Sequence, residues 1–189
     1  MKIAITGHTA GIGRAFAQYL SGRGHEIIGL SKRDGHNIRV IPKIIERITP
    51  CDMWINNAQA GYAQTELLYK IVDHWAHESN KMIWNISTMM TTSNHIPKIP
   101  GLSHGHLAEY KNQKRALEDA FHELKYNGPK MCLIRPGAVA TQPYNEAGVN
   151  AAEVSKWVAT VCDFYLACVE NDLWPEELSL GFLPGAPAI

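Results

Sequence analysis

The sequence carries no excess of charge of either sign, because 18 Lys and Arg residues balance 18 Asp and Glu residues. Proteins that bind nucleic acid or anionic membranes through electrostatic attraction present a broad positive field, which a balanced chain does not supply. We therefore expect neither nucleic acid nor a membrane surface among the partners of this protein.

Long hydrophobic runs are also missing. No stretch reaches the roughly 18 apolar residues that a membrane-spanning helix needs. The N-terminus enters a strand-like run, MKIAIT, without the basic and apolar regions of a secretory signal. From this pattern we expect a cytoplasmic protein.

Closely paired cysteines are absent as well. The four cysteines form no CxxC pair and lack a secretory context, so we interpret them as free thiols: Cys51, Cys132, Cys162 and Cys168. Two histidine pairs, His74 with His77 at helical spacing and His104 with His106 in an expected Gly-rich loop, are explained by a solvated helix face and a loop. We expect no metal site.

What the chain does have is a regular alternation of short apolar runs and longer amphipathic ones, which is typical of βαβ units and a parallel sheet. The expected strands are Lys2–Thr6, Glu26–Ser31, Asp52–Asn56, Met82–Ser87, Lys130–Arg135 and Leu178–Leu183. The expected helices are Gly13–Arg23, Val40–Ile48, Gln64–Glu78, His106–Tyr126 and Ala151–Glu170. The pattern predicts an α/β fold with a doubly wound parallel sheet in one domain, residues 1–189.

Two expected loops are long: residues 89–105 and 142–150. Both follow the carboxyl ends of expected strands, where open α/β sheets bind their ligands. We expect them to supply the walls of a substrate pocket.

A glycine-rich turn, TGHTAGIG at residues 6–13, joins the first expected strand to the first expected helix. Glycines let the backbone turn sharply and approach a pyrophosphate, while the helix N-terminus offers free N–H groups and a partial positive charge. The turn predicts the dinucleotide site of a Rossmann-type domain, with contacts from Gly7, His8, Thr9, Gly11, Ile12 and Gly13. The alternative is a tight turn without a ligand.

Tyr110 and Lys114 lie four positions apart in the longest expected helix and therefore share one helix face. An ammonium beside a phenol lowers the phenol pKa, which makes tyrosine a usable acid or base near neutral pH. A second pair with this spacing, Tyr126 and Lys130, contains Gly128-Pro129, which should break the helix. We take Tyr110 and Lys114 as the proton-transfer pair; the alternative is a solvated helix face.

Basic residues follow the second expected strand, whose end meets the adenosine ribose in a Rossmann-type domain. An acidic side chain there repels a 2′-phosphate, but the first charged residues here are Lys32 and Arg33, preceded by Ser31. These three can bind the phosphate through charge-assisted hydrogen bonds. We expect NADP(H) to be preferred over NAD(H), and the alternative is a solvated basic turn.

Five segments, in this order, resemble the short-chain dehydrogenase/reductase family. They are the turn with its TGxxxGxG spacing, Asn56-Asn57-Ala58, Asn85-Ile86-Ser87-Thr88, Tyr110 with Lys114, and Pro136-Gly137 with Thr141. The resemblance implies that Thr88, or failing it Ser87, is the catalytic hydroxyl that fixes the substrate oxygen. It also implies cofactor contacts at Asn37, Ile38, Asn57, Ala58, Pro136, Gly137, Val139 and Thr141.

The resemblance implies an NADP(H)-dependent oxidoreductase that transfers hydride between nicotinamide and a carbonyl or alcohol substrate, with Tyr110 as acid or base. It implies a homodimer or homotetramer. An epimerase or dehydratase would need a larger C-terminal substrate domain. A dinucleotide-binding sensor or scaffold without turnover is the alternative from another class.

Three features depart from the family pattern. Gln59 stands where the family has glycine, and the third strand is reduced to Asn37-Ile38 or lost. The catalytic asparagine of the family has no convincing counterpart between Asn57 and Ser87, so the proton-relay water would be held differently.

Overall fold

The computed structural model describes residues 1–94, 96, 101–141 and 153–181. At its centre lies one parallel sheet of six strands in the order β2–β1–β3–β4–β5–β6. The strands are β1 (Lys2–Thr6), β2 (Glu26–Leu30), β3 (Met53–Asn56), β4 (Met82–Ile86), β5 (Lys130–Pro136) and β6 (Glu177–Leu180). The helices are α1 (Gly11–Gly22), α2 (Ile41–Ile48), α3 (Ala63–His74), α4 (His104–Leu124) and α6 (Val154–Glu170), with short 3-10 helices η1 (Lys32–Asp34) and η2 (Met89–Thr92). The expected α/β fold with a parallel sheet is confirmed.

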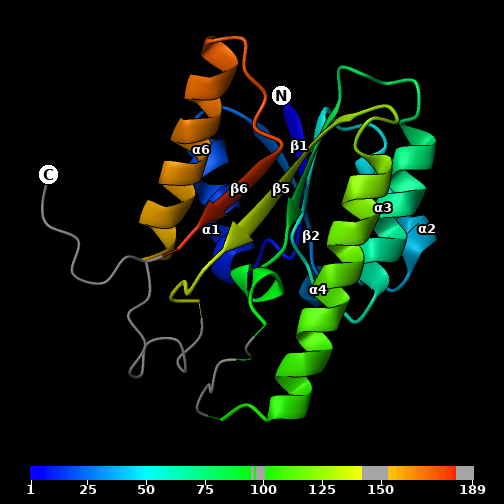
Figure 1. Ribbon diagram of the computed structural model, residues 1–189. Coiled ribbons are helices and arrows are strands. Elements are labelled where there is room, and N and C mark those ends of the chain that lie inside the picture. Colours follow the sequence, from blue (N-terminus) through cyan, green and yellow to red (C-terminus); the bar gives the residue numbers. More distant parts are fainter. Residues whose placement is uncertain (95, 97–100, 142–152, 182–189) are drawn as a thin grey trace, which may run out of the picture.

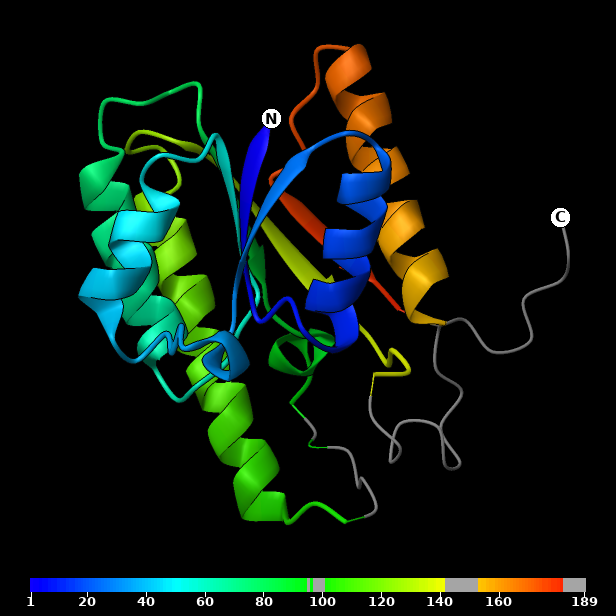
Figure 2. The same ribbon diagram turned by 180° about the vertical axis from the view of Figure 1, so that it is seen from behind.

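The helices cover both faces of the sheet. Helices α1 and α6 pack on one face, and α2, α3 and α4 pack on the other (Figures 1 and 2). Successive strand residues point to opposite faces, so Trp54 of β3 belongs to the core beneath α2, α3 and α4, and Ile55 belongs to the core beneath α1 and α6. Full burial of a large apolar side chain stabilises the fold by about 1.5–3 kcal/mol relative to exposure.

The strand that follows β2 in the family pattern, expected here to be reduced to Asn37-Ile38 or lost, is absent: the described chain has no strand between β2 and β3. Strand β2 forms an end of the sheet, and the chain turns directly into η1, where Ser31 accepts the Arg33 N–H. It then buries Ile38 in the core and enters α2 with Pro42 in its first turn, the place where the missing proline N–H costs nothing. The direct passage from β2 into α2 explains the shortness of this segment.

Some helix limits differ from the expected ones. Helix α4 begins two residues earlier, because the Ser103 side chain accepts the His106 N–H and caps the first turn. His104 and His106 therefore lie in a helix and not in a loop, so that interpretation was wrong. Helix α3 ends at His74, where the Trp75 N–H closes onto the Ile71 and Val72 carbonyls.

The expected long loop 142–150, and the first residues of the expected last helix, lie outside the described residues. Helices of the length and apolarity needed to cross a membrane do not occur in the part of the chain that the structure describes.

Candidate active site

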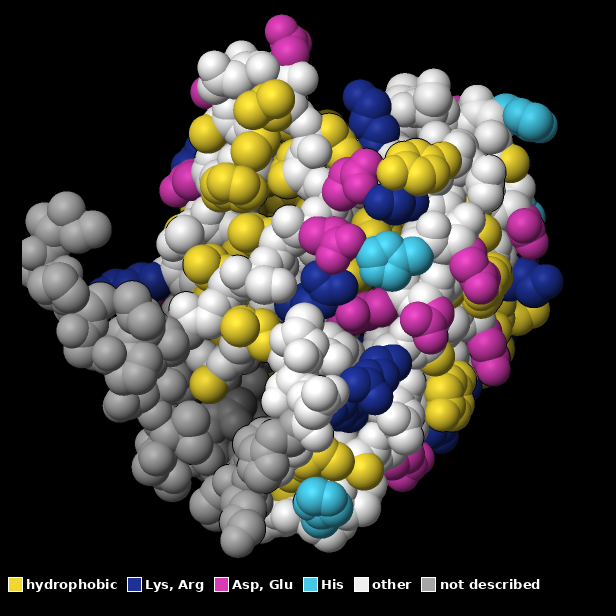
Figure 3. All heavy atoms as spheres, in the orientation of Figure 1, with side chains coloured by type: hydrophobic (Ala, Val, Ile, Leu, Met, Phe, Trp, Pro, Cys, Tyr) yellow, Lys and Arg dark blue, Asp and Glu magenta, His cyan; other side chains and the backbone are white. Residues whose placement is uncertain are grey.

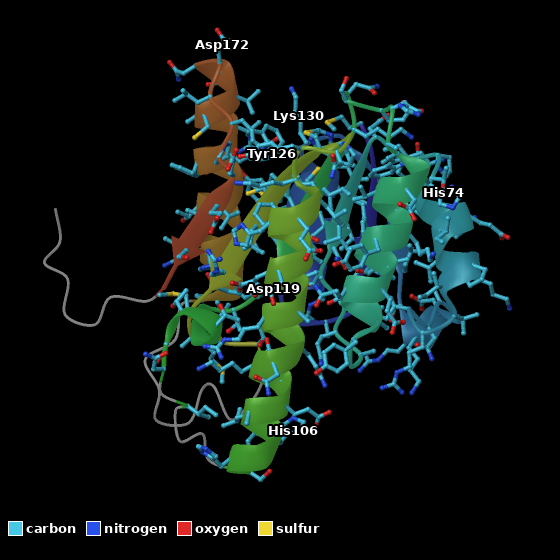
Figure 4. The ribbon with its side chains drawn as sticks, turned by 45° about the vertical axis from the view of Figure 1, so that its right-hand side comes forward. His74, His106, Asp119, Tyr126, Lys130 and Asp172 are labelled. Carbon is cyan, nitrogen blue, oxygen red and sulfur yellow. The ribbon has the colours of Figure 1, made fainter. Side chains whose placement is uncertain are left out.

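The carboxyl ends of the strands meet at one edge of the sheet, because all neighbouring strands are parallel. Thr6, Asn56, Ile86 and Pro136 end their strands there. The first turns of α4 extend past this edge (Figure 1), and His106 marks them in Figure 4. The segments singled out in the sequence after β1, β3, β4 and β5 thus come together at this edge.

The glycine-rich turn has the backbone that only glycine adopts readily. Gly7 and Gly11 have φ of +75° and +51°. A Cβ at Gly13 would lie 2.4 Å from the Gly7 carbonyl oxygen and 2.5 Å from Asn57 Nδ2. Helix α1 has no side-chain hydrogen bond at its N-cap, Ala10, so its first N–H groups remain for a ligand. These residues fit a dinucleotide pyrophosphate.

The turn is joined to the segment after β3. Thr6 Oγ1 accepts the N–H groups of Asn57 and Ala58 at 3.0 and 3.1 Å, and Asn57 Nδ2 donates to the Thr6 carbonyl at 2.9 Å. A Cβ at Gly11 would lie 3.2 Å from Cβ of Thr141, so the loop after β5 reaches the same turn. The structure therefore brings together three of the five segments at one point of the edge.

A second group of polar side chains lies where β2 ends. Thr9 Oγ1 is 3.0 Å from Ser31 Oγ, and either hydroxyl can donate. The His8 ring packs over Gly29, where a Cβ would lie 2.4 Å from it, and His8 Nε2 is 3.4 Å from Asp34 Oδ2. His8 thus occupies the space between the turn and β2 instead of pointing into open solvent.

A pocket of about 420 Å³ opens beside this edge, and its wall residues are Lys32, Asn37, Arg39, Gln59, Ala60, Gly61, His106, Glu109, Tyr110 and Gln113. Lys32, Asn37 and Tyr110 were expected at the site. Arg33 is exposed on η1 and Ile38 is buried in the core, and neither lines this pocket.

Sequence reasoning missed several of these wall residues, although a signal for some of them exists. Glu109 and Gln113 lie four positions apart in the helix expected to carry Tyr110, and Arg39 follows Asn37 by two residues. Gln59, which replaces the glycine of the family pattern, donates to Gln113 Oε1, and Gln113 Nε2 donates to Glu109 at 2.9 Å. This chain of polar groups ties the segment after β3 to α4.

Tyr110 and Lys114 share a face of α4 as expected, and the Lys114 ammonium lies 5.8 Å from the centre of the Tyr110 ring. Lys114 is buried and donates to Gln64 Oε1 and to the Ile86 carbonyl, both at 2.8 Å. Burial lowers the pKa of Lys114 to about 7, against the opposing effect of the Glu118 charge. The pair therefore combines a phenol at the pocket wall with an amine that titrates near neutral pH.

The two candidate hydroxyls have different partners. Ser87 Oγ donates to Glu118 Oε1, whereas Thr88 Oγ1 accepts the Met90 N–H at 3.3 Å and caps η2. An accepting hydroxyl keeps its own proton for another group, so Thr88 retains a donor and Ser87 has committed its donor to Glu118.

Glu118 is a buried residue that sequence reasoning missed. Its carboxylate also accepts from Thr91 Oγ1 at 2.7 Å and from Arg135 at 2.9 Å, and Arg135 bonds Glu177 at 2.6 Å. The network joins the end of β4 to α4, β5 and β6. Its signal in the sequence was the spacing of Tyr110, Lys114 and Glu118, each four residues apart on one helix face.

The second tyrosine–lysine pair lies elsewhere. Tyr126 and Lys130 are at the end of α4 remote from His106, beyond the helix end at Leu124 (Figure 4). The Tyr126 side chain is 78% exposed. The helix ends before Gly128-Pro129, as that dipeptide predicted, and the pair does not line the described pocket.

No protein-family model matches the chain, and no curated protein matches it significantly. Its fold does match solved structures. A short-chain dehydrogenase from Burkholderia cenocepacia in complex with NADP has a TM-score of 0.70, at 16% identity over 96% of this chain and 88% of that one. The 3-alpha-hydroxysteroid dehydrogenase from Pseudomonas sp. B-0831, complexed with NADH, has a TM-score of 0.67, at 16% identity over 96% of this chain and 95% of that one.

A third match is a short-chain dehydrogenase from Sphingobium yanoikuyae in complex with NADPH, with a TM-score of 0.63, at 16% identity over 99% of this chain and 89% of that one. Similarity at this level of identity concerns the architecture, because one fold can carry many functions. The chain thus has the fold of the short-chain dehydrogenases and reductases.

Proposed function

We propose that this protein is a short-chain dehydrogenase/reductase that uses NADP(H) to interconvert a carbonyl and an alcohol on a small molecule. The observation that carries the proposal is the position of Tyr110: its side chain lines the pocket, with the buried Lys114 on the same helix face. The glycine-rich turn and the uncapped N-terminus of α1 lie at the same edge of the sheet and fit the pyrophosphate.

The proposed chemistry needs one hydride and one proton. The nicotinamide, when bound, supplies the hydride to the carbonyl carbon or receives it from the alcohol. Tyr110 donates the proton to the carbonyl oxygen in reduction and takes it back in oxidation. The hydroxyl of Thr88 donates to the same oxygen and orients it.

Lys114 supports this proton transfer in two ways. When it is protonated, it stabilises the negative charge that develops on the Tyr110 oxygen during proton transfer. Two of its three protons are taken by Gln64 and the Ile86 carbonyl, which leaves one for a ribose hydroxyl. Further cofactor contacts are proposed at the residues that follow β3 and β5: Asn57, Ala58, Pro136, Gly137, Val139 and Thr141.

We propose that NADP(H) is preferred because two cations, Lys32 and Arg39, line the pocket beside Asn37. A 2′-phosphate there would gain charge-assisted hydrogen bonds, to which Ser31 adds a hydroxyl and the exposed Arg33 adds positive charge.

The double variant Lys32→Ala/Arg39→Ala is expected to weaken NADPH binding by a few kcal/mol at most, the scale of lost charged hydrogen bonds. NADH binding should barely change, and calorimetric titration at physiological salt measures both. Equal affinity of the native protein for NADH and NADPH would refute the preference.

The two hydroxyls give a separate prediction. Thr88→Val is expected to reduce turnover more than Ser87→Ala, because Thr88 keeps its proton for the substrate oxygen. Ser87→Ala instead removes one donor from the buried Glu118 carboxylate and should lower the free energy of unfolding by about 1–3 kcal/mol. Steady-state kinetics and urea unfolding of both variants measure these effects. The reverse order in turnover would assign the role to Ser87.

A dinucleotide sensor without turnover is the second candidate, favoured by the lack of a counterpart to the family's catalytic asparagine. The experiment that separates the two measures NADPH oxidation with a panel of aldehydes and ketones beside NADPH binding. Catalysis predicts oxidation with at least one carbonyl. Tight binding with no oxidation across the panel would favour the sensor. The expected homodimer or homotetramer stays a prediction, which light scattering of the purified protein would decide.

A further inference from the structure

A buried glutamine contacts the lysine of the candidate active site. Gln64 is the second residue of α3 and is 2% exposed. Its Nε2 donates to the Asn56 carbonyl at 2.7 Å and to the Ile86 carbonyl at 3.2 Å, and its Oε1 accepts from Lys114 Nζ at 2.8 Å. The Gln64 amide therefore joins the ends of β3 and β4 to α4.

The contacts fix which way this amide points. Carbonyl oxygens accept but never donate, so the amide nitrogen must face Asn56 and Ile86. An ammonium donates but never accepts, so the amide oxygen must face Lys114. With the amide reversed, its oxygen would face the two carbonyl oxygens and its nitrogen would face the ammonium, so none of the three hydrogen bonds could form. Gln64 thus presents a fixed acceptor to the lysine.

The side of the lysine that faces the sheet is uncharged in the described structure. Strand β4 offers the Ile86 carbonyl, and β3 offers Asn56, whose Nδ2 donates to the Gln64 carbonyl at 3.3 Å and to Asn85 Oδ1 at 3.0 Å. On α4 itself, Tyr110 and Glu118 are the titratable neighbours, and the carboxylate of Glu118 is held by Ser87, Thr91 and Arg135.

We propose that Gln64 is the positioning residue of this site, which holds the Lys114 ammonium in place and stabilises its charged form. The inference rests on the proposed function for the catalytic importance of Lys114, but the contact itself does not. Without the Gln64 oxygen, a buried ammonium would keep the Ile86 carbonyl as its only described hydrogen-bond partner. An amine that loses an acceptor in a buried place becomes harder to protonate.

The test follows the ionisation of Lys114 itself, in the full-length protein without ligand. Protein labelled with ¹³C at the lysine Cε is titrated by NMR, and the Lys114 resonance is identified by its loss in Lys114→Met. Gln64→Met keeps the length of the side chain and removes its polar atoms, and Gln64→Asn withdraws the amide by one methylene. Both variants are expected to lower the midpoint of the Lys114 titration by about one pH unit, a tenfold loss of proton affinity.

A matched control separates this effect from damage to α3. Ile71→Val loosens the core beneath the same helix without touching Lys114, and its titration should match that of the native protein. If one Gln64 variant fails to fold, the other gives the same comparison. A Lys114 midpoint that stays within a few tenths of a pH unit of the native value in a folded Gln64 variant overturns the proposal.

Measurements of turnover separate the role of Gln64 from the proposed reaction. If the native protein reduces a carbonyl, the pH profile of kcat should move in the same direction as the Lys114 midpoint. If the native protein turns over no carbonyl while the midpoint still falls in the Gln64 variants, the proposed reaction fails and the role of Gln64 stands. If turnover is present and the midpoint does not move, Gln64 is a structural residue only.

Discussion

The variant Tyr110→Phe is expected to lose about a hundredfold or more in turnover while it keeps its fold and its affinity for the cofactor. The phenylalanine ring fills the same space at the pocket wall and lacks only the hydroxyl that we propose as the proton donor. Hydride transfer to a carbonyl builds negative charge on the oxygen, and without a positioned acid this charge must be met by water. Single-turnover kinetics with NADPH, together with calorimetric NADPH binding, measure the two effects separately.

Tyr126→Phe is the matched control for this variant. Tyr126 carries the same side chain and the same spacing to a lysine, but it is 78% exposed and lies beyond the end of α4. Its variant should turn over as the native protein does. Normal reductase activity in Tyr110→Phe would remove Tyr110 from the mechanism.

The variant Gly13→Ala is expected to lose most of its affinity for the dinucleotide and to be less stable. The added Cβ would lie 2.4 Å from the Gly7 carbonyl oxygen and 2.5 Å from Asn57 Nδ2, and backbone cannot move aside as a side chain can. Overpacking of this kind costs typically 1–3 kcal/mol of folding free energy. The turn would have to open, which would move the α1 N-terminus away from the proposed pyrophosphate site. Urea unfolding and calorimetric binding measure both losses.

Gly22→Ala in the same helix is the control. A Cβ at Gly22 meets nothing within 4 Å, and alanine favours the helix over glycine by roughly 1 kcal/mol. This variant should be as stable as the native protein or slightly more so, with unchanged binding. Equal behaviour of the two alanine variants would contradict the account of the glycine-rich turn.

The fold could be predicted because its signals are local. Apolar runs of four to seven residues bounded by turns identify buried parallel strands, and all six expected strands occur, with limits that differ by at most one residue except at the end of β6, which stops at Leu180 and not at Leu183. The limits of helices are harder to predict from the sequence, since they depend on single capping residues. Ser103 starts α4 at His104, which the Gly-rich sequence around it concealed.

The candidate site could be predicted only in its motif residues. Residues four positions apart in a helix share one face, which places Tyr110 beside Lys114. The glycines of the first turn likewise predict a tight turn from the local sequence alone. The partners of Lys114 did not, because Gln64 lies 50 residues away and reaches it only through the packing of α3 against α4. Arg39 could not be predicted for a similar reason, because it lines the pocket only through the course of the segment between η1 and α2.

The distribution of charged and apolar side chains over the surface also could not be predicted from the composition. Figure 3 shows charged side chains of both signs over α4 and hydrophobic ones over α6, where Phe164, Leu166 and Val169 are exposed. The composition, with equal numbers of acidic and basic residues, carries no information on this segregation. It arises from the sequence of α6, which carries apolar residues on its exposed side as well as on its buried side.

The most direct test of the account is a crystal structure of the protein with NADP. We expect the pyrophosphate at the N-terminus of α1 beside Gly11 and Gly13 and the 2′-phosphate between Lys32 and Arg39. We expect the nicotinamide ribose within hydrogen-bond distance of Lys114. Nicotinamide C4 should then face the hydroxyl of Tyr110. A dinucleotide bound elsewhere, or one whose nicotinamide lies away from Tyr110, would contradict the proposed function.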